Sequence, residues 1–413
     1  MRKASLIAIL VCLPFVLSAE SEIRFSFWGN EMRFKAMERA VLLYEERNPD
    51  VDIILDEHSY SDCQQAFRIR TKEGTLSDIS AYDYKWTSWI EDEALSDLRD
   101  FPSLDISSLD ESLLEKYSMK NSKIIGIPLG MNGLGLVYNE DFIERFSLSD
   151  PSFWTWDDII ENGSKVHEED HSSYLFFVPD SQWHYIFRTF ILQMSGHHII
   201  NEDGSPGCTV EDLEAALQFV LILIETGTIP DFGIGTLYEN WLPQRNEMWI
   251  NGKWGMTVAS SSTVPDIASL SPFPVGTAPY PVEKDAIDSG VYAAPTMLLS
   301  ISENSEHKVE AADFIGYLVH DTIAAAMLSD SCGLPVDKHN AKSVSADSLV
   351  YPMVISALEN SAAVTIPYEM EDELQVVISE YVHMVGFRIL TPDEAAKRMM
   401  DRIELISESF QNK

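Results

Sequence analysis

Hydrophobic and polar positions along the first third of the chain alternate between two periodicities. Three short runs rich in β-branched and aromatic residues predict strands, at 23–28, 51–55 and 79–82. Between them, apolar residues at helical spacing predict helices, at about 37–44 and 62–72. Strands that alternate with helices in this way indicate α/β layers with parallel strands.

The pattern changes near Lys123. Two extended runs, 124–128 and 134–138, flank a glycine-containing segment and suit a crossing between two lobes. Helical periodicity dominates afterwards, and the predicted helices span 156–168, 182–194, 210–225, 239–251, 307–327, 345–359, 371–383 and 392–410. Two further strands are predicted, at 254–258 and 297–301.

The first residues predict a cleavable secretory signal peptide over 1–19. A basic start at residues 2–3 precedes an apolar run over 4–17 and small residues at 18–19. The run is shorter than the roughly 20 residues that a membrane-spanning helix needs, and Pro14 interrupts it. Val11 is bulkier than the small residue that usually precedes a lipid-modified cysteine, so we expect no lipid anchor at Cys12. We therefore expect a periplasmic or extracellular protein.

Acidic residues outnumber basic ones by 66 to 29, which gives a formal net charge of −37. This charge excludes nucleic acid as an expected partner, because phosphate binding needs clustered Lys and Arg. It also disfavours anionic solutes and leaves neutral sugars and cationic polyamines open.

The length and the 45% hydrophobic content predict two or three domains. Outside the predicted signal peptide, three cysteines remain, an odd number that leaves at least one thiol free or paired between chains: Cys63, Cys208 and Cys332.

The motif that most resembles an enzyme site is His167, Glu168 and His171, which fits the HExxH zinc pattern. Zinc chemistry needs both histidines on one continuous helix, a third ligand and an open coordination position. Here the match falls at the end of a short predicted helix and runs into Asp170 and Ser172, so His171 is expected in a turn. We favour a solvated, charged helix end and keep an exported zinc hydrolase as an alternative.

Other catalytic and cofactor signatures are missing from the sequence. The glycines at 130, 133 and 135 lead into a strand, whereas a phosphate-binding loop opens a helix, so flexibility or close packing explains them better. There is no GxSxG nucleophile elbow, no Walker loop and no CxxC pair. We therefore expect a protein that is not an enzyme and that needs no cofactor and no metal.

Tryptophans at the ends of predicted elements are the strongest binding signal in the sequence. They are Trp28, Trp86, Trp183 and Trp241. Clefts form at strand ends in α/β proteins, and aromatic rings there can stack on the CH faces of a sugar. If Trp183 stacks in this way, Trp183→Ala should weaken sugar binding by about 1–3 kcal/mol.

Seven segments, in order along nearly the whole mature chain, resemble the family 1 extracellular solute-binding proteins of ABC importers. They are IRFSFWGNEMRFKAMERAVLLYEERNPDVDI, EGTLSDISAYDYKW, IIGIPLGMNGLGLVYNEDF, WTWDDII, NGKWGMTVASSS, SEHKVEAADFIGYLV and CGLPV. Each segment is a weak match, but their order and spacing together are specific. The chain departs from the family pattern at Cys63, where Tyr is frequent, at Ser77, where Pro is common, and at Cys332, where Arg is common.

The resemblance implies an α/β, two-lobed periplasmic binding protein fold of type II, in which each lobe is a mixed sheet flanked by helices and hinge strands join the lobes. We assign residues 20–130 and 275–329 to the N-lobe and residues 131–274 and 330–413 to the C-lobe. The implied partners are a small-molecule ligand, expected to be a sugar and specifically an oligosaccharide, and the permease subunits of an ABC transporter in the membrane. A monomer is expected.

The resemblance also implies a ligand site in the interlobe cleft. Rings would stack on the sugar, and Arg33, Asp83 and Asn132 would bond to its hydroxyl groups. The full set of implied ligand-binding residues is Trp28, Asn30, Arg33, Tyr60, Asp83, Trp86, Asn132, Trp183, Trp241, Ser261 and Tyr292. Two alternatives stay open: a non-sugar ligand such as a polyamine, and a sensory role in which the loaded protein docks on a chemoreceptor or kinase.

Overall fold

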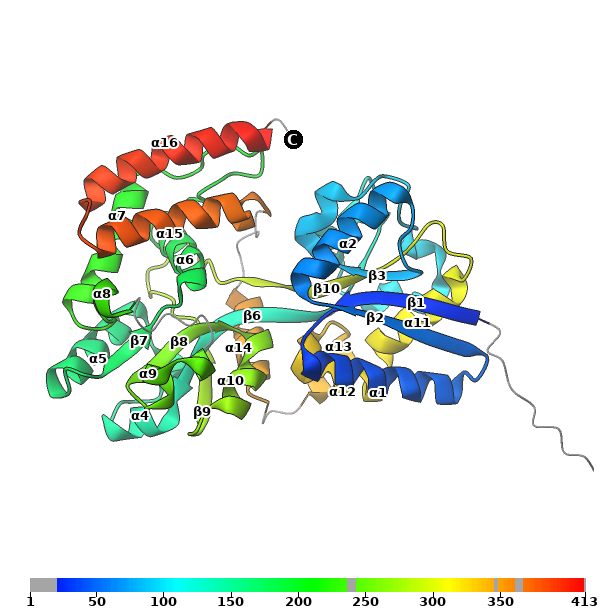
Figure 1. The fold of residues 1–413 in the computed structure, drawn as a ribbon, viewed down its shortest axis with the longest axis horizontal. Coiled ribbons are helices and arrows are strands. Elements are labelled where there is room, and N and C mark those ends of the chain that lie inside the picture. Colours follow the sequence, from blue (N-terminus) through cyan, green and yellow to red (C-terminus); the bar gives the residue numbers. More distant parts are fainter. Residues whose placement is uncertain (1–20, 236–242, 345–347, 361–366, 412–413) are drawn as a thin grey trace, which may run out of the picture.

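The computed structural model describes residues 21–235, 243–344, 348–360 and 367–411. They form two α/β lobes joined by long strands (Figure 1). The predicted signal peptide and Trp241 lie outside the described residues. Within these residues, no single helix is long and apolar enough to cross a membrane, although α11 (Lys308–His320) and the start of α12 (Thr322–Cys332) pass that test together across a 68° bend.

The N-lobe begins with the predicted alternation of strands and helices. Its strands β1 and β2 are parallel and paired from Ser21 with Val51 to Trp28 with His58, and β3 continues the sheet in parallel with β1. Beyond the long N-lobe strands lies a small hairpin, β4–β5. The elements are β1 (Ser21–Trp28), β2 (Val51–His58), β3 (Ile79–Tyr82), β4 (Met119–Lys120), β5 (Lys123–Ile124), α1 (Glu31–Arg47), α2 (Tyr60–Glu73), α3 (Glu111–Tyr117), α11, α12 and α13 (Lys338–Ser343).

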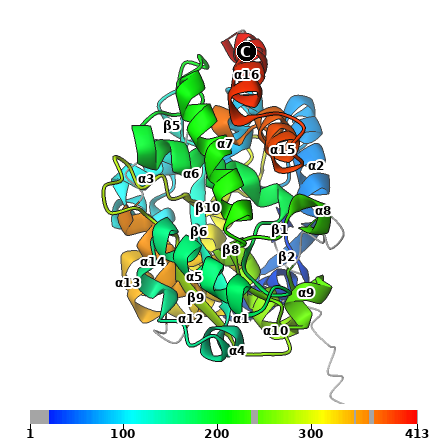
Figure 2. The same cartoon turned by 90° about the vertical axis from the view of Figure 1, so that its left-hand side faces the viewer.

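The C-lobe is mostly helical, as the sequence predicts. Two of its helices, α5 and α7, begin with capping boxes in which Thr155 and Thr209 exchange hydrogen bonds with the third helical residue. The elements are α4 (Glu140–Arg145), α5 (Trp156–Glu169), β7 (Tyr174–Phe177), α6 (Trp183–Ser195), α7 (Val210–Glu225), α8 (Phe232–Gly235), α9 (Glu247–Ile250), β8 (Trp254–Ser260), α10 (Val264–Leu270), β9 (Val275–Pro279), α14 (Val350–Asn360), α15 (Asp372–Gly386) and α16 (Pro392–Gln411). Figure 2 shows this lobe end-on.

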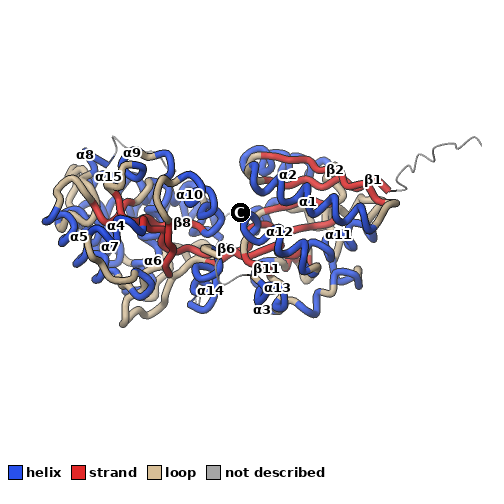
Figure 3. Tube along the Cα trace, turned by 90° about the horizontal axis from the view of Figure 1, so that it is seen from below, coloured by secondary structure: helices blue, strands red, loops and turns tan. Residues whose placement is uncertain are grey.

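Two strands, β6 (Ile127–Asn139) and β10 (Ala293–Ile301), run from one lobe into the other (Figures 1 and 3). They pair with each other in antiparallel register, so all of the described strands except the pair β4–β5 form one continuous sheet in the order β2-β1-β3-β10-β6-β8-β7, with β9 and β11 (Leu334–Pro335) also on β6. The second predicted run, 134–138, and the end of the first, 127–128, are therefore one long strand, whereas Ile124 of the first run belongs to β5. The fold class predicted from the sequence is confirmed.

The lobe boundaries differ from the predicted ones at two places. β9 was assigned to the N-lobe, but it pairs with Gly135–Asn139 of β6, and Ala278 lies in the C-lobe core. Residues 330–343 were assigned to the C-lobe, but Asn340 of α13 donates to the carbonyl of Val319 at the end of α11. The chain thus returns to the N-lobe only through β10, and it leaves again after α13.

Two predicted helices are broken in the structure. The helix expected over 307–327 is divided at Asp321, whose carboxylate caps α12 by accepting from the backbone N–H groups of Ile323 and Ala324. In the described part of 239–251, Asn246 caps α9 in the same way and separates it from a short 3-10 helix, Pro243–Arg245. In both cases a side-chain oxygen competes with helix continuation, which apolar periodicity alone does not detect.

Close packing explains the glycines of the crossing strand. A Cβ at Gly130 would lie 2.1 Å from the carbonyl oxygen of Cys332, and one at Gly133 would lie 2.6 Å from the Cβ of Ala357.

The three cysteines outside the predicted signal peptide are buried and free, and burial raises the pKa of the Cys63 and Cys208 thiols to about 12. These thiols are therefore unreactive core groups.

Candidate functional site between the lobes

The carboxyl ends of the parallel N-lobe strands bring four predicted residues together. Trp28 ends β1, Tyr60 follows β2, and Asp83 and Trp86 follow β3. The ring centroids of Trp28, Tyr60 and Trp86 are 5.3–5.6 Å apart, and the Tyr60 hydroxyl donates to Asp83 Oδ2 at 3.0 Å. We call these four residues the N-lobe cluster.

The three rings of the N-lobe cluster differ in exposure. Tyr60 is 41% exposed, whereas Trp28 and Trp86 are 6% and 1% exposed. Trp86 packs on its inner side against Phe67 and Trp89. Tyr60 therefore offers the accessible ring face, and the two tryptophans hold it in place.

A second group of tyrosines lies where the lobes meet. The Tyr84 hydroxyl of the N-lobe is 3.4 Å from that of Tyr292, which precedes β10, and the ring of Tyr292 is 5.4 Å from the ring of Tyr185 in α6. Burial raises the pKa of all three phenols above the usual value of 10, so they remain protonated hydrogen-bonding groups. Tyr185 and Tyr292 are nevertheless only half-buried.

Charged groups from both lobes act on Lys85. Burial lowers the pKa of its ammonium group, but the negative charges of Asp83, Asp372 and Glu371 outweigh that effect, and the net shift is upward. Asp83 belongs to the N-lobe, whereas Glu371 and Asp372 stand at the start of α15 in the C-lobe. We use the name interlobe site for Tyr60, Asp83, Lys85, Tyr185, Tyr292 and Asp372.

A buried ion pair fixes the C-lobe half of the interlobe site. Arg188, one turn after Tyr185 in α6, donates from Nε to Glu369 Oε2 at 2.6 Å, and the two side chains are 2% and 0% exposed. The other carboxylate oxygen, Oε1, accepts from the backbone N–H of Ile199 at 2.7 Å, and His198 Nδ1 lies 3.1 Å from Oε2. Glu369 lies three residues before Asp372, so this network ties α6 to the start of α15.

Asn132 and Ser261 join β6 to the end of β8. The Ser261 hydroxyl donates to Asn132 Oδ1 at 3.2 Å and accepts from the backbone N–H of Gly133 at 3.1 Å. Ser261 is fully buried and Asn132 is half-buried. The two predicted residues are thus in contact, and Asn132 is the more accessible of them.

Asn30 and Arg33 make structural contacts at the start of α1. Asn30 caps the helix through Oδ1, and its amide donates to Asp266 Oδ2 of the C-lobe at 3.0 Å. Arg33 is 8% exposed, and its guanidinium donates to the carbonyls of Ser331 and Trp28. Asn30 therefore bridges the lobes, while Arg33 supports the backbone beneath Trp28.

Trp183 lies in the C-lobe core. Its side chain is 3% exposed, and its ring centroid is 5.8 Å from that of Phe232. In this conformation its ring presents almost no surface to a ligand.

The burial of Trp183 leads to a prediction. We expect Trp183→Ala to lower the free energy of unfolding by about 3–5 kcal/mol, because it removes a buried aromatic side chain. Denaturant titration followed by circular dichroism measures this loss. Trp89→Ala, at a half-buried ring, serves as the control with a smaller expected loss; equal effects of the two changes would contradict the difference in packing.

The sequence pattern missed several residues of the interlobe site. Tyr185 sits two residues after the predicted Trp183, and the phase of α6 turns Tyr185 toward the other lobe and Trp183 toward the core. Lys85 stands between two predicted residues and could have been found from its neighbours. Asp372 comes from a segment almost three hundred residues away in sequence from Asp83, and no local signal marks it.

The zinc alternative gains no support from the geometry. α5 ends at Glu169, and His171 lies in the following turn, as predicted. The rings of His167 and His171 are 5.2 Å apart, and His167 stacks on Tyr174. Among the described residues, no group of three or more His, Cys, Asp or Glu side chains could hold a metal.

Comparison with known proteins places the chain in a family. The model of the bacterial extracellular solute-binding proteins matches residues 28–323. The probable amino-acid ABC transporter periplasmic-binding protein y4oP of Sinorhizobium fredii is 19% identical over 365 residues, which are 84% of this chain and 80% of that protein. The melibiose/raffinose/stachyose-binding protein MelE of Bacillus subtilis is 22% identical over 308 residues, 72% of this chain and 70% of that protein.

Solved structures agree at the level of the fold. A periplasmic oligogalacturonide binding protein from Yersinia enterocolitica, in complex with saturated digalacturonic acid, superposes with a TM-score of 0.82 at 19% identity. The match covers 95% of this chain and all of that one. Because the family model spans most of the chain and the two-lobed fold agrees with it, the chain belongs to the bacterial extracellular solute-binding protein family.

Proposed function

We propose that this chain is the exported solute-binding subunit of an ABC importer, and that it captures a neutral oligosaccharide between its lobes and delivers it to a membrane permease. The observation that carries the proposal is the composition of the interlobe site. In the N-lobe, Tyr60 contacts Trp28 and Asp83. Where the lobes meet, Tyr292 contacts Tyr84 and Tyr185. Tyr60 is exposed, and Tyr185 and Tyr292 keep partial exposure. A ligand that contacts both halves would stabilise the closed arrangement.

Sugar chemistry fits these groups. The ring of Tyr60 offers a flat apolar face for the CH groups of a pyranose, and the Tyr185 phenol combines such a face with a hydrogen-bonding group. Asp83 and Asp372 provide carboxylate oxygens, which are strong acceptors for hydroxyl groups. The relative MelE carries melibiose, raffinose and stachyose in its name, which supports a carbohydrate ligand.

The charge of the interlobe site favours a neutral sugar over an acidic one. The negative charges of three carboxylates, from Asp83, Glu371 and Asp372, act on Lys85 and raise its pKa. Arg188, whose charge acts on Tyr185, is already paired with Glu369. A uronate would add a further negative charge to this group at a cost in free energy, whereas a neutral hydroxyl group would not.

A thermal-shift panel tests the proposed ligand class. Neutral oligosaccharides should raise the melting temperature, because a ligand that binds only the folded state stabilises it. Uronate oligosaccharides should have a smaller effect at the same concentration. If a uronate stabilises the protein more than every neutral sugar, the charge argument is wrong.

The second candidate ligand is a cationic solute such as a polyamine, which the same three carboxylates would favour. Binding of a polyamine should weaken as the salt concentration rises, because dissolved ions screen the attraction between its charges and the carboxylates. A polyamine that raises the melting temperature strongly at low salt and weakly at high salt, while neutral sugars have no effect, would replace the sugar proposal.

The charge argument also predicts the effect of Asp372→Asn. This change removes one carboxylate beside Lys85 and should improve uronate binding about tenfold relative to neutral sugar binding. Calorimetric titration of both ligands measures the ratio. Glu373→Gln, a similar loss of charge at the next residue, which is exposed like Asp372, is the control and should leave the ratio nearly unchanged. An unchanged ratio in Asp372→Asn would remove Asp372 from the site.

A further inference from the structure

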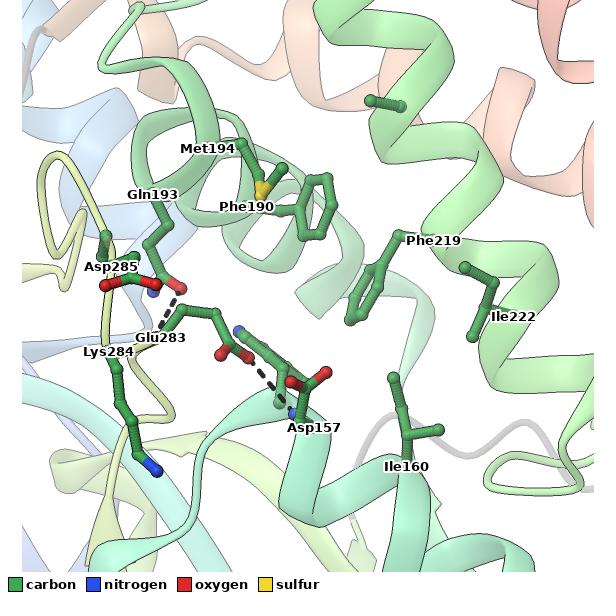
Figure 4. Close-up of a pocket in the computed structure, with 13 residues that line it drawn as sticks. Asp157, Ile160, Phe190, Gln193, Met194, Phe219, Ile222, Glu283, Lys284 and Asp285 are labelled. Atoms are coloured by element: carbon green, nitrogen blue, oxygen red, sulfur yellow. Dashed lines mark hydrogen bonds between the residues drawn. The ribbon is translucent and has the colours of Figure 1, made fainter.

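A cavity of about 550 Å³ lies inside the C-lobe, between α5, α6, α7 and the segment 283–286 (Figure 4). It shares none of its lining residues with the interlobe site. Its volume is in the range of small-molecule binding sites. Most of its wall is apolar: Trp156, Ile160, Phe190, Met194, Ala215, Phe219 and Ile222.

The apolar wall is largely aromatic. Phe190 stacks on Phe219 at 4.5 Å between ring centroids, and Trp156 meets Phe219 edge to face at 5.2 Å. Trp156 is 2% exposed, and its indole Nε1 is buried with no hydrogen-bond partner in the described part of the chain. A buried N–H group without a partner is uncommon, and here it belongs to a residue that lines the cavity.

One edge of the cavity is acidic. Figure 4 shows Asp157, Glu283 and Asp285 on the same side, opposite Phe219 and Ile222, while the side chain of Lys284 runs away from them. Glu283 Oε1 accepts from the backbone N–H of Asp157 at 3.2 Å. Burial raises the pKa of Glu283, and the negative charge of Asp157 raises it further. Lys284 also lines the cavity, so this edge sets three carboxylates against one ammonium group and is acidic on balance.

The mouth of the cavity is also apolar. Met194 is 57% exposed at its rim. Ile287, just beyond the lining segment, is 67% exposed and bonds through its backbone N–H to the carbonyl of Gln193. Exposed apolar side chains that gather at an opening are typical of a binding surface.

We propose that this cavity binds an organic ammonium ion with an apolar body, such as an arylalkylamine. The body would lie against the rings of Trp156, Phe190 and Phe219, and the ammonium group would face the carboxylates of Asp157, Glu283 and Asp285. Cations are attracted to aromatic faces, and a carboxylate at the same place adds a charge-assisted hydrogen bond. This site is separate from the proposed sugar site.

Three probes with the same ring and different charges test the proposal: phenethylammonium, phenethyl alcohol and phenylacetate. Ligand-observed NMR on the full chain should show binding of phenethylammonium at least tenfold tighter than that of the other two, because only the cation compensates the acidic edge. Similar binding of all three probes, preference for phenylacetate, or no binding of phenethylammonium would overturn it.

Two variants test whether phenethylammonium binds in this cavity. Glu283→Gln should weaken phenethylammonium binding about tenfold through loss of one charge-assisted hydrogen bond, and Glu73→Gln, in the N-lobe, is the matched control. Ala215→Trp starts from an exposed position on α7 and should fill the cavity and abolish binding while the protein stays folded. Unchanged binding in both Glu283→Gln and Ala215→Trp would contradict the site. The interlobe ligand should not displace the amine, so failure here and failure of the sugar proposal are distinguishable.

Discussion

Glu369→Ala is expected to lower the free energy of unfolding by about 3–5 kcal/mol, because it leaves the buried guanidinium of Arg188 without its carboxylate. The same change removes the acceptor for the backbone N–H of Ile199. Urea denaturation of the purified protein measures the loss. Glu373→Ala, at an exposed position in the first turn of α15, should cost less than about 1 kcal/mol and serves as the control.

The loss should depend on pH in a defined direction. Burial alone would raise the pKa of Glu369, but the positive charge of Arg188 and the hydrogen bond with His198 outweigh burial and lower the pKa below its ordinary value. A carboxyl group with a depressed pKa stabilises the fold fully above its unfolded pKa and loses that effect as the pH falls through its folded pKa. The difference between wild type and Glu369→Ala should therefore shrink in acid. A difference that grows in acid would contradict the assignment.

Tyr185→Ala is expected to weaken oligosaccharide binding by about 2 kcal/mol, close to thirtyfold, because it removes a ring from the centre of the interlobe site. Calorimetric titration with the sugar that gives the largest thermal shift measures the change. Tyr185→Phe keeps the ring and loses only the hydroxyl group, so its effect should be smaller. If Tyr185→Ala binds as tightly as the wild type and remains folded, Tyr185 does not contact the ligand.

The N-lobe half of the interlobe site was predicted in two ways: Trp28 and Trp86 from their places at strand ends, and Tyr60 and Asp83 from the family resemblance. The parallel strands β1, β2 and β3 explain why these residues meet, because the residues that end or follow parallel strands lie at one edge of the sheet. Trp28 ends β1, Tyr60 begins α2 and Asp83 follows β3. Their mutual contacts confirm that arrangement, although contact with a ligand stays a prediction.

The C-lobe half could not be predicted in the same way. Its side chains come from helices, and a shift of two residues along α6 exchanges a buried ring, Trp183, for one that faces the other lobe, Tyr185. Apolar periodicity does not give helix phase to that accuracy. Asp372 begins α15, which the buried pair of Arg188 and Glu369 ties to α6, a contact between distant segments that no local pattern encodes.

The lobe boundaries were missed for a related reason. The resemblance predicted strands that cross between the lobes. The lobe to which each later strand belongs depends on which part of β6 that strand pairs with. β9 pairs with the C-lobe end of β6 and β11 with its central part, around Gly130 and Met131. Both are short strands in segments rich in proline and glycine, where periodicity carries little information.

The central claim is that the ligand is a neutral oligosaccharide held between the lobes. A crystal structure of the protein grown with the neutral sugar that gives the largest thermal shift tests it most directly. We predict density for the sugar between the N-lobe cluster and α6, in contact with Tyr60, Asp83 and Tyr185. Sugar density only at another place, such as the C-lobe cavity, with the interlobe site free of ligand, would contradict the account.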